Sequence, residues 1–348
     1  MAFNHFYYRD KFVLESGRLL SNFQLGYTAY GTLNAEKNNV VWIFHALTAN
    51  SDPAEWWPSL VGKDKLFDPA YHFIICVNMP GSCYGSTGPL DIDPQTRQPF
   101  YHDFPVFTTR DMVRAYRTLQ HHLGISKIRI GIGGSMGGQQ LLEWAIEDPD
   151  LFENIFPIAT NAVHSPWGKA FNASQRMCIE ADATWQQKNP DAGRSGMKAA
   201  RSVALLSYRH YDTYLMSQSE ENQSKLDNYK SDSYQRYQGE KLSKRFNAFS
   251  YYFLSKSMDA HNLARGRKNM RMALATIKAK TTVIGIETDL LFPLSEQQFL
   301  AENIPDAEFS VIRSDFGHDG FLIEHTQIEE LIAGNIASAK NIVRADSV

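Results

Sequence analysis

The sequence predicts an α/β fold: a mostly parallel sheet with a helical insertion late in the chain. Three short, unbroken apolar runs are typical of strands buried on both faces: Val40–Phe44, Phe73–Val77 and Ile128–Ile132. Helical stretches separate these runs, and such alternation is typical of a parallel sheet with helices on both sides. Because 43% of the 348 residues are hydrophobic, the chain can bury a sizeable core.

The chain before the first buried run predicts a hairpin. Lys11–Glu15 and Phe23–Tyr30 alternate apolar and polar residues around Ser16-Gly17, which indicates two strands with one solvated face. The clearest helix of the next region is Thr109–Leu123, in which apolar residues recur at helical spacing.

Further strand candidates are Phe156–Ala159, Thr282–Ile286 and Phe309–Ile312. Between the first two lies a stretch rich in Ser, Gln, Asn, Lys and Tyr, with helical segments at Lys198–Tyr208 and Phe246–Met258. A polar part, Ser217–Gln238, reads as a loop or a frayed helix end. The predicted organisation is therefore an α/β core formed by residues 1–160 and 279–348, interrupted by a helical insertion at 161–278.

Composition excludes several classes of function. Lys and Arg total 35 against 38 for Asp and Glu, so the net charge of -3 gives no long-range attraction to nucleic acid or an anionic membrane. No apolar run approaches the roughly 18 residues of a membrane span, and the N-terminus lacks the pattern of a signal peptide. Three scattered cysteines make neither a disulfide framework nor a zinc cluster. We expect a cytoplasmic protein without a metal, a nucleic-acid partner or a membrane partner.

The densest chemical signal is the glycine-rich stretch Gly131–Gly138, between the strand Ile128–Ile132 and a predicted helix from Met136 to about Glu147. It fits a nucleophile elbow, G-x-S-x-G, in which Ser135 occupies a strained turn between small neighbours. It also fits dinucleotide binding, but that motif expects the first βαβ unit and an acidic residue about 20 positions on. Glycines that only permit close strand–helix packing are a third reading, so the stretch alone leaves the choice open.

The candidate partners of Ser135 follow later strands. A serine hydroxyl needs a base, and the base needs an acid that orients it; in α/β-hydrolases they follow in the order serine, acid, histidine. Asp289 comes after strand Thr282–Ile286 and His318 after strand Phe309–Ile312. Both are therefore expected on loops at the carboxyl ends of strands. Glu287 is an alternative acid, less favoured because it lies nearer the strand.

An acyl-transfer site also needs two backbone N–H groups for the oxyanion of the tetrahedral intermediate. One would come from the residue after the nucleophile, Met136, and the other from the early loop His45-Ala-Leu-Thr48, where Leu47 is the candidate. A plain core position is an equally good reading of Leu47 from spacing alone.

Several separate motifs resemble those of homoserine O-acetyltransferases, the acyltransferase branch of the α/β-hydrolase fold. The motifs are His45-Ala-Leu-Thr48, Gly81-Ser-Cys-Tyr-Gly-Ser-Thr-Gly-Pro89, Thr109-Arg-Asp-Met-Val113, Gly134-Ser-Met-Gly-Gly138, Leu291-Phe-Pro293, Gly317-His-Asp319 and, in the insertion, Ser233-Tyr-Gln-Arg-Tyr-Gln-Gly239, Arg245-Phe246 and Met258-Asp259. The likeness runs from about residue 12 to residue 335.

The resemblance implies an α/β-hydrolase fold and a two-step transfer for methionine biosynthesis. Ser135 would take the acetyl group from acetyl-CoA, a co-substrate rather than a bound cofactor, with His318 as base and Asp289 orienting it. L-Homoserine would then accept the group. The resemblance also implies a homodimer joined through the insertion, which would serve as a lid.

The resemblance further implies how the acceptor is held. Arg201 matches the arginine that binds the carboxylate of homoserine, Tyr208 matches its neighbouring tyrosine, and Asp319 matches the acid that binds the ammonium group. Because the segment near 186–196 is shorter than is usual in the family, Arg209 is a second candidate for the arginine.

Three alternatives remain from the sequence. The first keeps the fold but uses succinyl-CoA as donor or serine as acceptor, a difference that rests on few side chains. The second is an esterase or thioesterase, in which water accepts the acyl group. The third is a non-catalytic relative that binds a ligand or partner; the ordered set of Ser135, Asp289 and His318 argues against it.

Overall fold

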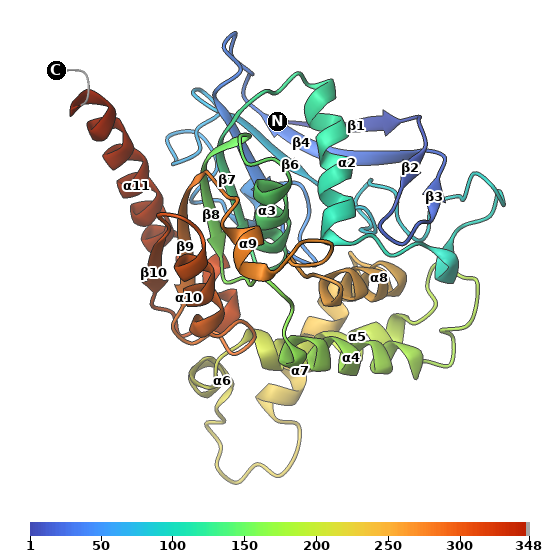
Figure 1. Ribbon diagram of the computed structural model, residues 1–348. Coiled ribbons are helices and arrows are strands. Elements are labelled where there is room, and N and C mark those ends of the chain that lie inside the picture. The colour runs from blue at the N-terminus through green and yellow to red at the C-terminus, as the bar shows by residue number, and fades with distance from the viewer. Residues whose placement is uncertain (346–348) are drawn as a thin grey trace.

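In the computed structural model, which describes residues 1–345 and the side chains of residues 1–336, the core is an eight-stranded sheet (Figure 1). Its strands are β1 (Ala2–Tyr8), β4 (Phe23–Tyr30), β5 (Val40–Phe44), β6 (Phe73–Val77), β7 (Ile128–Gly134), β8 (Phe152–Ile158), β9 (Lys280–Ile286) and β10 (Glu308–Ile312). Their spatial order is β1-β4-β6-β5-β7-β8-β9-β10. Strand β4 is antiparallel to both of its neighbours, and all other neighbouring pairs are parallel. The predicted mostly parallel sheet is confirmed.

The helices belong to two groups, those that cover the sheet and those of the insertion. They are α1 (Pro53–Trp56), α2 (Thr109–His122), α3 (Met136–Glu147), α4 (Pro166–Glu180), α5 (Arg194–Tyr208), α6 (Tyr211–Gln218), α7 (Lys230–Ser243), α8 (Ala248–Asp259), α9 (Met270–Leu274), α10 (Leu294–Asn303) and α11 (His325–Ala345), with 3-10 turns η1 (Tyr101–Asp103) and η2 (Gly317–Leu322).

Alternation along the central strands explains why both faces of the sheet are covered. In β5, Val40, Trp42 and Phe44 pack into one apolar cluster, whereas Val41 and Ile43 pack into another on the opposite face. The first cluster includes side chains of α2, α3 and α10, and the second includes side chains of α11. The five residues of β5 are all buried, which is why the sequence shows an unbroken apolar run there.

Helices α4–α8 form a separate layer beyond one end of the sheet, below it in Figure 1. All five lie between β8 and β9 in the chain, within the predicted insertion at 161–278. Because β7, β8 and β9 are parallel, their carboxyl ends share one edge, and the insertion leaves from that edge. This arrangement places the insertion over the loops that carry the predicted site residues.

The predicted hairpin is wrong in its pairing. Strand β4 pairs with β1, at the N-terminus, rather than with Lys11–Glu15. The Ser16-Gly17 turn exists, but it joins two short strands, β2 (Phe12–Val13) and β3 (Leu19–Leu20), in a sheet of their own. Strand β1 is an edge strand whose residues are exposed or half-buried, so it lacks the buried apolar run that marks the central strands.

The polar stretch Ser217–Gln238 is only partly a loop. Residues 219–229 connect α6 to α7, but α7 begins at Lys230 and continues to Ser243. Three residues of α7 are buried: Gly239, Leu242 and Ser243. Gly239 lies directly against the backbone of Lys198 in α5, so the helix is held by packing that its polar sequence does not reveal.

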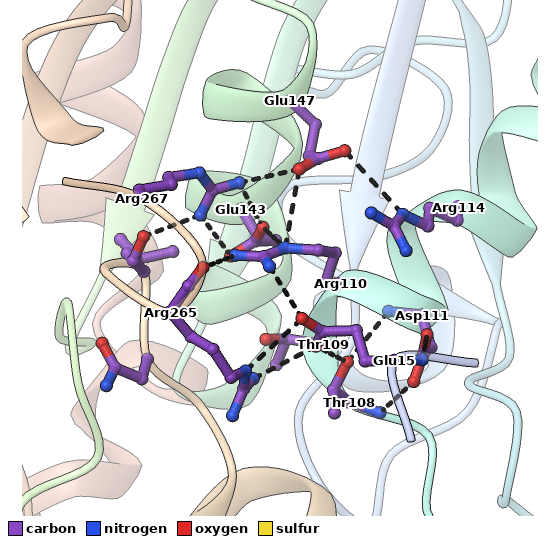
Figure 2. A network of polar contacts seen from close by, with 12 residues as sticks. Glu15, Thr108, Thr109, Arg110, Asp111, Arg114, Glu143, Glu147, Arg265 and Arg267 are labelled. Carbon is purple, nitrogen blue, oxygen red and sulfur yellow. Dashed lines mark hydrogen bonds and ion pairs between the residues drawn. The ribbon is translucent and has the colours of Figure 1, made fainter. Parts of the chain in front are cut away.

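A network of buried charges joins α2, α3 and the chain that returns from the insertion (Figure 2). Arg110 of α2 contacts Glu143 of α3 through Nε at 2.7 Å, and its Nη1 contacts Glu15, also at 2.7 Å. Arg267, in the loop after α8, contacts Glu143 at 2.6 Å and Glu147 at 2.8 Å. The insertion is thereby fixed to the core on the side of the sheet that α2 and α3 cover.

Of the predicted second core segment, 279–348, residues 346–348 lie outside the described residues. Through residue 345, the structure contains no helix with the length and apolar character to cross a membrane.

His261 lies beside the charged network of Arg110, Glu143 and Arg267, and it is fully buried and neutral. Its Nε2–H donates to the carbonyl of Asn161 at 3.0 Å, and its Nδ1 accepts from the Thr109 hydroxyl at 3.0 Å. Burial lowers the pKa of His261 to about 3. Below about pH 6.5, the ordinary pKa of a histidine, His261 therefore binds a proton in the unfolded chain but not in the folded chain.

We therefore expect the unfolding free energy of the protein to decrease as the pH is lowered. Below about pH 6.5, a histidine of this kind lowers the unfolding free energy by up to about 1.4 kcal/mol for each pH unit of acidification, until the pH reaches its pKa in the folded protein. His261→Gln should lose stability less steeply between about pH 6.5 and pH 5, as measured by urea unfolding. His121→Gln, an exposed position of α2, is the control and should keep the parent slope. Equal slopes for His261→Gln and the parent protein would contradict this prediction.

Candidate active site

Ser135 occupies a sharp turn between β7 and α3. Its φ is 57°, a region that a non-glycine residue rarely adopts, at a cost of roughly 1–3 kcal/mol. A Cβ on Gly133 would lie 2.6 Å from the Gly137 backbone, and one on Gly137 would lie 2.2 Å from the carbonyl oxygen of Phe44. The turn therefore fits only between glycines, as the nucleophile-elbow interpretation requires.

Backbone contacts to the neighbouring strand hold the serine in this turn. The N–H of Ser135 donates to the carbonyl of Ile158 at 2.9 Å, and its own carbonyl accepts from the Thr160 hydroxyl at 2.8 Å. Ser135 is 5% exposed and lines a cleft. The side chain is thus fixed at the edge of the sheet but remains accessible from the cleft.

Asp289 and His318 form the pair that the sequence predicted. The Nδ1–H of His318 donates to Oδ2 of Asp289 at 2.6 Å. The other carboxylate oxygen accepts from the backbone N–H groups of Leu291 and Phe292, at 2.8 and 2.9 Å. Since a carboxylate cannot donate, the proton lies on Nδ1 and leaves Nε2 as the free acceptor. Glu287, the alternative acid, is exposed.

Aromatic side chains fix the plane of the histidine. Phe292 stacks on the His318 ring with centroids 5.0 Å apart, and Phe321 meets it edge-on at 5.4 Å. Tyr208, at the end of α5, lies 5.8 Å from it. The insertion therefore touches the candidate base directly.

The structure brings most of the predicted site residues into one cleft of about 420 Å³. Its lining includes Leu47, Ser135, Arg201, Tyr208, His318 and Asp319. Asp289 lies behind His318, and Met136 is the buried first residue of α3, next to Ser135. Among the described residues, no group of three or more His, Cys, Asp and Glu side chains could hold a metal ion.

The loop that carries Leu47 leaves the sheet beside the serine turn, because β5 pairs with β7 and Phe44 lies opposite Gly133. His45 anchors this loop. Its Nδ1–H donates to the carbonyl of Ala46 at 2.9 Å, and its Nε2 accepts from the backbone N–H of Met79 at 3.1 Å. Burial lowers the pKa of His45 to about 4, so it stays neutral at pH 7 and keeps the Nε2 acceptor.

Charged side chains of both signs face the cleft. Asp319 pairs with Arg209 at 3.0 Å, whereas the guanidinium of Arg201 lies 5.4 Å from the centre of the Tyr208 ring. Both candidate arginines therefore reach the site. Sequence reasoning assigned no role to three further charged residues of the lining: Glu55, Lys241 and Arg245. Only Arg245 carried a signal, as part of the Arg245-Phe246 motif.

Comparison with known proteins agrees with this geometry. A family model described as the alpha/beta hydrolase fold matches residues 39–324. A homoserine O-acetyltransferase from Cyclobacterium marinum is 48% identical over 327 residues, which span 94% of this chain and 93% of that protein. A homoserine O-acetyltransferase from Nostoc punctiforme is 41% identical over 93% of each chain. The chain belongs to the homoserine O-acetyltransferase family.

Solved structures extend the likeness to the fold. The crystal structure of a homoserine O-acetyltransferase from Bacillus anthracis has a TM-score of 0.88 at 24% identity, and covers 95% of this chain and 96% of that one. Esterase E22 is similar, with a TM-score of 0.84 at 24% identity, covering 95% and 99%. Both confirm the α/β-hydrolase fold. Because family members and an esterase share it so closely, the fold itself does not select the acyl acceptor.

We expect Gly137→Ala to destabilise the protein and to remove its activity. The new methyl group would meet the Phe44 carbonyl oxygen, a backbone atom that cannot move aside, so the unfolding free energy should fall by about 3 kcal/mol. Denaturant unfolding measures this change. In Gly334→Ala, on α11, the added methyl meets no atom within 4 Å, so this control should gain roughly 0.5–1 kcal/mol. Equal stability changes in the two variants would contradict the packing argument.

Proposed function

We propose that this chain transfers the acetyl group of acetyl-CoA to the hydroxyl of L-homoserine, forming O-acetyl-L-homoserine for methionine biosynthesis. The observation that carries the proposal is the Asp289–His318 pair at 2.6 Å, whose histidine lines one cleft with Ser135 on its strained turn. Relatives of 48% and 41% identity that are named for this activity support it.

In the first step, Ser135 Oγ attacks the thioester carbonyl while His318 Nε2 takes its proton. Asp289 holds the imidazole and stabilises its positive charge. The backbone N–H groups of Met136 and Leu47 donate to the oxyanion as the tetrahedral intermediate forms. The intermediate collapses, the C–S bond breaks, and the thiol of coenzyme A leaves with the proton from His318.

In the second step, His318 Nε2 deprotonates the homoserine hydroxyl, whose oxygen attacks the acetyl-serine. The ester bond to Ser135 breaks, and Ser135 recovers its proton from His318. These two reaction steps require neither a metal ion nor a bound cofactor. The chemistry makes an acetyl ester on the acceptor and regenerates the free serine.

The charges of the cleft suit a zwitterionic acceptor. We assign the homoserine carboxylate to Arg201, with Tyr208 stacked against the guanidinium at 5.4 Å. Asp319, next to the base, takes the ammonium group and is oriented by Arg209 at 3.0 Å. Holding the hydroxyl near His318 lets it outcompete water, because well-oriented groups reach effective concentrations of up to about 10⁸ M.

We further propose a cytoplasmic homodimer in which residues 161–278 act as lid and dimer contact over a core of residues 1–160 and 279–348. Exposed apolar side chains on α6 support a contact there: Tyr211, Leu215 and Met216. Direct contact between the end of α5 and the His318 ring supports the lid role.

The test is thiol release from acetyl-CoA with and without L-homoserine. We expect homoserine-dependent release that Ser135→Ala lowers by at least about 10³-fold, because the nucleophile is lost. Succinyl-CoA and L-serine serve as comparison substrates. Faster release with succinyl-CoA or with L-serine would reassign the donor or the acceptor.

Two other outcomes of this experiment would assign the protein to a different functional class. Thiol release that ignores every acceptor means an esterase or thioesterase, the activity for which the structural neighbour esterase E22 is named. Absence of turnover with all donors, together with retained ligand binding in Ser135→Ala, means a non-catalytic binding protein.

Asp319→Asn should weaken acceptor binding without abolishing acylation. Loss of the charge should raise the KM for L-homoserine by about tenfold or more, because the ammonium group loses a charge-assisted hydrogen bond. The burst of thiol released from acetyl-CoA without acceptor should stay stoichiometric with enzyme. Asp315→Asn, an exposed carboxylate on the same loop, is the control. An unchanged KM in Asp319→Asn would remove the assigned role.

A further inference from the structure

The cleft holds more positive charge than a homoserine molecule can use. Four cations line it, against two acids: Arg201, Arg209, Lys241 and Arg245 against Glu55 and Asp319. Homoserine itself carries one carboxylate and one ammonium group, and so needs one cation and one anion. The surplus is local, since the whole chain has a net charge of -3.

Only one of the four cations has an acidic partner. Arg209 is paired with Asp319 at 3.0 Å, whereas within the described residues Arg201, Lys241 and Arg245 have no carboxylate within 4 Å. Arg201 lies over Tyr208, which itself contacts His318, and is the cation assigned to the acceptor carboxylate. Lys241 and Arg245 therefore remain as positive charge that neither an acid nor homoserine compensates.

Arg245 is held in a defined place at the wall of the cleft. Its Nη1 donates to the carbonyl of Thr48 and, at 2.8 Å, to the hydroxyl of Tyr84. Thr48 follows Leu47, the proposed oxyanion donor. Both contacts use Nη1, so the Nε and Nη2 donors of Arg245 are available to a ligand.

Lys241 lies on the same side as Arg245, four residues earlier at the end of α7. The N–H of Arg245 still donates to the carbonyl of Leu242, so the last turn continues to that residue. Lys241 and Arg245 are both exposed and both line the cleft. They form a pair of cations on the insertion wall of the cleft.

We propose that Lys241 and Arg245 form the subsite for the phosphate groups of the acyl-CoA donor. This inference rests on the proposed function. Coenzyme A is the one substrate of that reaction with phosphate groups, and two unpaired cations at an accessible wall match its charge. The guanidinium offers a planar fork to phosphate oxygens and the ammonium a mobile point charge. The pantetheine arm then leads from this wall to Ser135.

The experiment compares two acetyl donors that differ only in their phosphates, acetyl-CoA and S-acetylpantetheine. Lys241→Gln should raise the KM for acetyl-CoA by about three- to tenfold, the effect of one charged contact at an exposed site. Its KM for S-acetylpantetheine should change by less than about twofold. Arg245→Gln should show the same contrast, and Arg245→Lys should recover part of it. Lys244→Gln, exposed on the same turn but outside the cleft lining, is the matched control.

A second measurement uses adenosine 3′,5′-bisphosphate as a probe. It should inhibit the reaction with S-acetylpantetheine in the parent protein, and inhibit Lys241→Gln less. Equal effects of Lys241→Gln on both donors, or effects equal to those of Lys244→Gln, would overturn the subsite. A rise confined to the KM for L-homoserine would assign these cations to the acceptor carboxylate instead. Failure of the proposed function is distinct, because the parent protein would then show no acceptor-dependent transfer from either donor.

Discussion

The close approach of helix α3 to the end of strand β5 is the constraint on which the site depends. Gly137 lies so near the Phe44 carbonyl that even a methyl group would overlap with it. This contact holds Ser135 at φ 57° and brings the proposed nucleophile beside the loop of Leu47. One packing contact thus sets both the strained serine and its distance from the second oxyanion donor. The strain is maintained by rigid neighbours on two strands.

The far end of the same helix is held by charges instead of close packing. Glu143 and Glu147 of α3 contact Arg110 and Arg267, as Figure 2 shows. A buried ion pair adds little net stability, but removal of one partner leaves a buried charge that costs about 3–5 kcal/mol. Arg267 belongs to the chain returning from the insertion. The network therefore ties the helix that starts at Ser135 to the segment that covers it.

The sequence predicted the sheet interior and the candidate triad because both depend on local patterns. Buried strands such as β5 give unbroken apolar runs, and Ser135 and Asp289 follow two of the buried strands, β7 and β9. His318 follows β10, a short and mostly exposed edge strand. Edge strand β1 was missed, since exposed residues leave no such run. The start of α7 was missed because its stability comes from Gly239 packing on α5, a contact between segments about 40 residues apart. Lys241 and Arg245 were unassigned for the same reason: only the packing of α7 turns them toward the cleft.

The proposed site is divided between core and insertion. Ser135, Asp289 and His318 all stand on core loops. The four cations of the cleft all come from the insertion: Arg201, Arg209, Lys241 and Arg245. In the proposed reaction, the acyl-serine forms on the core, whereas the charges that would select a zwitterionic acceptor and a phosphorylated donor belong to the insertion. Since Tyr208 also contacts His318, movement of the insertion would change substrate binding and the environment of the base together. In the proposed mechanism, the insertion would exclude water by closing on its charged substrates while the acyl-serine exists.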